Sequence, residues 1–93
     1  MGEKERIMFM EDKLLDTIEP YFAFMHFDED WFQSSGYKKN DYKYAEVSNK
    51  NVSGCARYIH VKLEDAVRSA EHTNDFCKRI GNDERITIYK INH

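Results

Sequence analysis

Two cysteines and four histidines are the residues of this chain best suited to metal binding or nucleophilic chemistry. Four residues separate Cys55 from His60, and the same spacing recurs in reverse order between His72 and Cys77. This pattern suggests a four-ligand zinc site. On a strand, however, positions 55 and 60 face opposite sides, and on a helix positions 72 and 77 lie about 140° apart. We therefore expect no metal and no cofactor. The two cysteines are expected to be free thiols in a reducing compartment, with a single Cys55–Cys77 disulfide as the alternative.

No arrangement of side chains predicts a catalytic reaction. A nucleophilic pair of cysteine and histidine is conceivable, but Cys77 lies on the apolar stripe of a predicted helix and is expected in the core. Exposed carboxylates are poor general acids. The four glycines are scattered through the chain, so they form no glycine-rich phosphate loop. We predict that the protein is not an enzyme, with a small enzyme or an enzyme subunit as an alternative.

An acidic and aromatic N-terminal region is the strongest feature of the sequence. Residues 1–34 contain nine acidic and three basic side chains, a local charge of −6, whereas residues 35–93 have a charge of +3. If residues 4–19 are helical, the acids on one face lie about 5–6 Å apart. The predicted binding surface contains seven acids and two aromatic anchors: Glu5, Asp12, Asp16, Glu19, Asp28, Glu29, Asp30, Trp31 and Phe32.

Such a row of carboxylates has a counterpart in the phosphates of a DNA duplex. The charge pattern therefore predicts an inhibitor or adaptor, in the manner of a DNA mimic, that docks on the basic surface of a nucleic-acid-handling protein. The alternative interpretation is an ordinary amphipathic helix whose acids keep one face in water. Short chains rich in acids and aromatics often come from phages and viruses, so the composition is associated with a viral accessory protein.

A second group of residues combines tyrosines with lysines and could bind single-stranded nucleic acid. Its members are Tyr42, Lys43, Tyr44, Tyr58 and Lys62. Tyrosines on the outer face of a sheet can stack bases while lysines hold phosphates. The alternative is a polar outer face whose lysines keep an edge strand from pairing. Because the net charge of the chain is −3, nucleic acid is the less favoured partner.

The helices and strands that must position these residues can be predicted from the sequence, and together they indicate an α+β fold of one domain. Apolar residues with helical spacing run through residues 4–33, and Pro20 interrupts them, which predicts a kinked helix or a pair of helices. A competing interpretation places short strands at residues 7–10 and 21–27. Residues 37–47, 57–63 and 85–91 are predicted strands, and residues 64–80 a helix. We expect a small, mostly antiparallel three-stranded sheet with that helix packed on it, in the order α-α-β-β-α-β.

Composition also limits the location and the assembly of the protein. The chain has no run of about 18 apolar residues and no signal-like N-terminus. We therefore expect a cytoplasmic protein without a membrane partner. The phenylalanines at positions 22, 24 and 27 either pack inside the monomer or form an interface with a second copy, which would make a homodimer.

Overall fold

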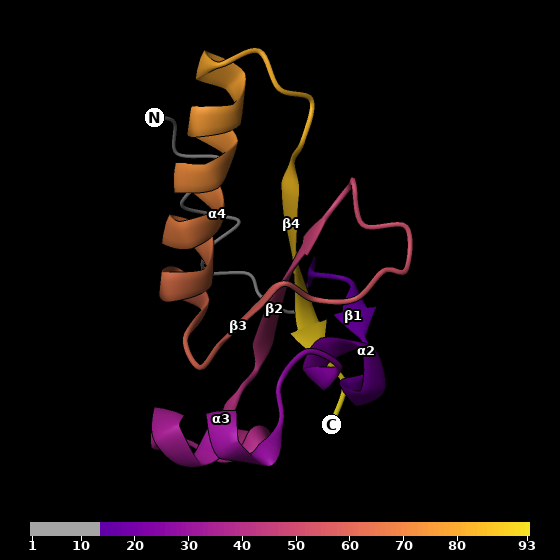
Figure 1. Cartoon of the computed structure of the whole chain (residues 1–93), viewed down its shortest axis with the longest axis vertical. Helices are drawn as coiled ribbons and strands as arrows, with labels where there is room; N and C mark the ends of the chain where they lie inside the picture. The colour runs from indigo at the N-terminus through magenta and orange to yellow at the C-terminus, as the bar shows by residue number, and fades with distance from the viewer. Residues whose placement is uncertain (1–13) are drawn as a thin grey trace.

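The computed structural model describes residues 14–93. In chain order, these residues form β1 (Thr17–Ile18), α2 (Pro20–Phe24), α3 (Glu29–Ser35), the 3-10 helix η2 (Lys39–Asp41), β2 (Tyr44–Ser48), β3 (Tyr58–His60), α4 (Leu63–Arg79) and β4 (Ile86–Ile91) (Figure 1). The predicted α+β class is confirmed, because helices accompany a single small sheet of mostly antiparallel strands.

The sheet contains four strands in the order β1-β4-β2-β3. β2 pairs antiparallel with β3 and β4, and β1 pairs parallel with β4. The prediction of three strands is therefore corrected by the addition of β1. Lys90 N donates to Asp16 O (2.8 Å), and Asn92 N donates to Ile18 O (2.9 Å). These bonds hold the segment around Ile18 extended, although its apolar spacing is also compatible with a helix.

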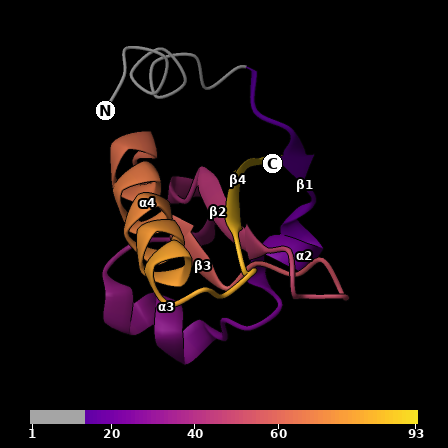
Figure 2. The same ribbon diagram turned by 90° about the horizontal axis from the view of Figure 1, so that it is seen from above.

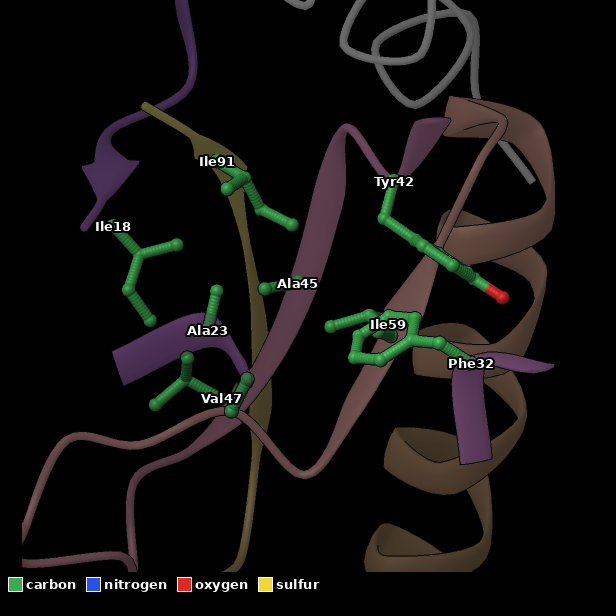
Figure 3. Packing of buried hydrophobic residues seen from close by; sticks show 9 residues of the cluster. Ile18, Ala23, Phe32, Tyr42, Ala45, Val47, Ile59 and Ile91 are labelled. Atoms are coloured by element: carbon green, nitrogen blue, oxygen red, sulfur yellow. The ribbon is translucent and has the colours of Figure 1, made fainter. Parts of the chain in front are cut away.

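Helices cover both faces of the central strands. β2 and β4 lie between α4 on one side and α2 on the other (Figure 2). On the α2 side, Ala45 and Val47 of β2 pack with Ala23 and Phe32 in the main apolar cluster (Figure 3). Because successive strand residues face opposite sides, Tyr44, Glu46 and Ser48 point to the α4 side. All five residues of β2 are buried.

The C-terminal helix and strand match their predictions closely. The helix predicted at residues 64–80 is α4, and its buried residues Ala66, Val67, Ala70 and Cys77 recur at the spacing of one helical face. Acids in its first turn and bases in its last turn suit the helix dipole. Gly81, with a φ of 73°, provides the left-handed residue that follows the helix.

The N-terminal half differs more from its prediction. Residues 15–19 are not helical, and Leu14, one of the apolar residues of the predicted helical pattern, is 72% exposed. Pro20 begins α2, as predicted, and Gly36 ends α3 with a φ of 82°. The strand predicted at residues 37–47 begins only at Tyr44, because η2 forms a compact turn first. The part of the predicted N-terminal helix at residues 4–13 lies outside the described residues.

Candidate functional site

The described part of the acidic and aromatic surface is concentrated on α3. Asp28 caps this helix, since Trp31 N donates to Asp28 Oδ1 (2.9 Å). Glu29 Oε1 forms an exposed ion pair with Lys39 Nζ (3.3 Å). Asp30 has neither a hydrogen bond nor an ion pair with any of residues 14–93. The N-cap and the first turn of α3 thus present three carboxylates, of which one is paired with a cation.

Trp31 lies on the surface beside these acids and rests on buried aromatic rings. Its side chain is 38% exposed. Its ring lies 4.6 Å from the ring of Phe27, 5.1 Å from Phe32 and 5.7 Å from Tyr42, measured between centroids. Phe32 is only 5% exposed and belongs to the core. Phe32 is therefore not part of the binding surface, contrary to the prediction, and packs beneath the ring of Trp31.

The other predicted acids do not join this surface. Asp16 and Glu19 flank β1 instead of sharing a helix face, because residues 15–19 are not helical. Glu19 Oε1 accepts a hydrogen bond from Asn92 Nδ2 (3.1 Å). Glu5 and Asp12 lie outside the described residues. We call the remaining set, Asp28, Glu29, Asp30 and Trp31, the α3 surface.

The tyrosines predicted to stack on bases do not share one exposed face of the sheet. Tyr42 and Tyr44 are 5% and 8% exposed, because the strand that follows η2 lies at the centre of the sheet. Tyr58 is half exposed, and Lys43 and Lys62 are exposed. Only one tyrosine of the three is thus free to stack on a base.

The phenylalanines of the N-terminal region divide between core and surface. Phe24 and Phe27 pack against the main apolar cluster, whereas Phe22 is 40% exposed. The two inner rings are therefore covered within the monomer.

Both cysteines are buried free thiols. Cys55 Sγ lies 3.1 Å from Met25 Sδ, between the β2–β3 loop and the end of α2. Among residues 14–93, no three histidine, cysteine or acidic side chains come together in a way that could hold a metal ion.

A buried pair of polar residues was missed by sequence reasoning. Glu46, in the middle of β2, is fully buried, and its Oε2 forms a hydrogen bond with Nε2 of His60 on β3. Its Oε1 has no hydrogen-bond partner among the described residues. Glu46 and His60 lie diagonally across the pairing of β2 with β3. The signal available in the sequence was an acid in one predicted strand and a histidine in the next.

A second polar network lies at the C-terminal end of β2, around Ser48. Ser48 Oγ donates to Glu84 Oε2 (2.6 Å), and Arg57 Nη1 donates to the same oxygen (2.7 Å). The hydrogen bond from Ser48 and the positive charge of Arg57 lower the pKa of Glu84. A carboxylate with a lowered pKa is a poor general base, so this network is structural and ties the segment before β4 to β2 and β3.

A hollow of about 710 Å³ lies beside α2. It is lined by the apolar residues Pro20, Tyr21, Phe24 and Met25 and by the polar residues Lys39, Asn40 and His93. We call it the α2 hollow. It is near the α3 surface, since α2, α3 and the C-terminal end lie at the same end of the molecule (Figure 1).

Comparison of this chain with protein-family models, curated proteins and solved structures finds no match. No helix within residues 14–93 has both the length and the apolar composition needed to cross a membrane.

Proposed function

We propose that this protein binds a protein partner and docks on a basic surface of that partner through the α3 surface. The observation that carries the proposal is the position of Trp31, whose exposed ring lies in the same helical turn as Glu29 and Asp30. Tryptophan is enriched among the residues that dominate binding energy at interfaces. Carboxylates around such an anchor favour a cationic partner and accelerate association.

The charges of α3 support a basic partner. The helix has acids in its first turn and no basic residue in its last turn. The ion pair between Lys39 and Glu29 is exposed, so it contributes little energy and can be exchanged for a pair with the partner. The Asp30 carboxylate can pair with a cation of the partner without the loss of a hydrogen bond or ion pair within residues 14–93.

A nucleic-acid-handling protein of the cytoplasm is the kind of partner that we propose, because its nucleic-acid groove is a basic surface. Binding there would make this protein an inhibitor or an adaptor. The proposal leaves out mimicry of a duplex, since the described acids of the α3 surface occupy one helical turn and form no long row.

Capture experiments with matched charge variants test this proposal. Asp30→Lys and Trp31→Ala change the α3 surface without removing the Asp28 cap. Asp75→Lys makes the same charge change in the half of α4 that points away from α3 (Figure 1). The proteins captured from a lysate are compared by quantitative mass spectrometry after each variant is shown to fold by circular dichroism.

We expect basic proteins that the wild type and Asp75→Lys both capture and that Asp30→Lys and Trp31→Ala both lose. Equal capture by all four proteins would refute the role of the α3 surface. Salt-sensitive binding of a fluorescent single-stranded oligonucleotide, unaffected by these variants, would instead favour the nucleic-acid-binding alternative.

A further inference from the structure

The α2 hollow has the composition of a site for a flat anionic molecule. Its volume of about 710 Å³ falls within the range of about 300–1,000 Å³ that is usual for small-molecule sites. Its lining combines apolar side chains with three side chains that can donate hydrogen bonds. No aspartate or glutamate side chain among residues 14–93 lines it.

The apolar residues of the lining offer one exposed ring, one partly buried ring and a polarizable thioether. Tyr21 is 70% exposed, and its ring is held edge-on against the ring of Phe22, with centroids 5.2 Å apart. Phe24 lies 5.8 Å from the ring of His93, with 30° between the two planes. Met25 is 43% exposed. An aromatic ligand could cover these groups and remove apolar surface from water.

The polar residues of the lining can supply positive charge and hydrogen-bond donors. Lys39 Nζ lies 5.6 Å from the centre of the Phe32 ring as well as beside Glu29, so its position is restrained. The Asn40 amide has no hydrogen bond within the described residues. His93 is oriented by the hydrogen bond from its Nε2 to Tyr42 O (2.7 Å). The Asn40 amide is therefore available to an anionic group, and Lys39 can bind one in exchange for its exposed ion pair with Glu29.

We propose that the α2 hollow binds a free nucleoside monophosphate, with the base against Tyr21, Phe24 and Met25 and the phosphate near Lys39 and Asn40. Lys39 is the ion-pair partner of Glu29 in the α3 surface, but Tyr21 and Asn40 take no part in that surface. The Tyr21→Ala variant therefore tests the hollow separately from the proposed docking on a basic protein.

Titration of the full chain with AMP, followed by heteronuclear NMR, tests the site. We expect chemical-shift changes that begin at Tyr21, Lys39 and Asn40, and weaker binding of adenosine and of inorganic phosphate when each is titrated alone. Lys39→Gln should weaken AMP binding about tenfold, as expected for the loss of one charge-assisted hydrogen bond. Tyr21→Ala should weaken it about fivefold, through loss of stacking.

Lys78→Gln, near the C-terminal end of α4, is the matched control and should leave AMP affinity unchanged. Equal AMP binding by Lys39→Gln and the wild type would overturn the proposal, as would phosphate binding as tightly as AMP. A short oligoadenylate that binds more tightly than AMP would overturn the assignment to a free nucleotide. Tyr21 is largely exposed, and circular dichroism confirms whether its variant is folded.

Discussion

At the scale of single residues, the buried pair of Glu46 and His60 is the most unusual feature of the described chain. A carboxylate is almost never fully buried unless it is paired. Here one oxygen is paired with the histidine, and the other has no hydrogen-bond partner among residues 14–93. Removing the histidine should therefore be more costly than removing both members of the pair, because a buried unpaired carboxylate carries a large desolvation penalty.

His60→Leu should lower the free energy of unfolding by about 3 kcal/mol, and the double variant Glu46→Leu/His60→Leu should recover most of that loss. Urea unfolding followed by circular dichroism measures both changes. If the double variant is as unstable as His60→Leu, the loss comes from disrupted packing around His60, and the polar pair does not explain it.

Glu84 gives a second prediction, on the pH dependence of stability. Its pKa is lowered below the ordinary value of 4.5 in the folded state by Ser48 and Arg57. A lowered folded pKa stabilises the native state above the ordinary pKa, and this contribution disappears as the pH falls through the lowered value. Glu84→Gln should therefore be less stable than the wild type at pH 7, with a difference that shrinks below about pH 4.5. Thermal unfolding at several pH values measures this difference, and a constant difference across that range would contradict the network.

At the scale of elements, α4 stabilises the sheet through one side chain in addition to its apolar face. Asn74 Nδ2 donates to Ile86 O (3.2 Å), and Ile86 N donates to Asn74 Oδ1 (2.7 Å). β1 pairs with β4 only at Lys90 and Ile91, so it does not reach Ile86. The amide of Asn74 therefore takes the place of a neighbouring strand at that end of β4.

Asn74→Ala should destabilise the protein by about 2 kcal/mol, because it leaves two backbone groups of Ile86 without partners. Hydrogen exchange should show a specific loss of protection at the Ile86 amide, while amides in the middle of α4 keep theirs. Unchanged protection at Ile86 would mean that this contact does not hold β4.

The local pattern of apolar residues was sufficient to predict α4 and β4. It was not sufficient to predict the structure of the segment around β1. The apolar residues of α4 repeat over several turns, so their period alone identifies the buried face. Ile18 is buried because its two-residue strand pairs with Lys90 and Ile91, more than seventy positions away. No local pattern contains that information, and helical spacing fits the same residues.

For the candidate site too, features set by neighbouring residues were predicted, and features set by packing between distant segments were not. Acids beside Trp31 were evident from the sequence, and the structure places them in one exposed turn. The burial of Phe32, Tyr42 and Tyr44 was not predicted, because it depends on how α3 and β2 pack in the whole molecule. The diagonal arrangement of Glu46 and His60 likewise depends on strand register.

At the scale of the whole molecule, the elements proposed for binding lie at one end. α2, α3 and the C-terminal residues gather there, whereas the C-terminal end of α4 lies at the other end (Figure 1). Exposed aromatic side chains at this end include Tyr21, Phe22, Trp31 and Tyr37. The carboxylates of Asp28, Glu29 and Asp30 at this end agree with an orientation in which it approaches a cationic partner.

The most direct test of the central proposal is to observe Trp31 itself, since it is the only tryptophan in the chain. The protein is labelled with 5-fluorotryptophan, and its fluorine NMR signal is recorded with and without a basic partner identified by capture. Our account predicts that the signal of the wild type and of Asp75→Lys shifts on binding and loses its exposure to solvent. A complex that forms while this signal keeps its free position and its solvent exposure would contradict docking through the α3 surface.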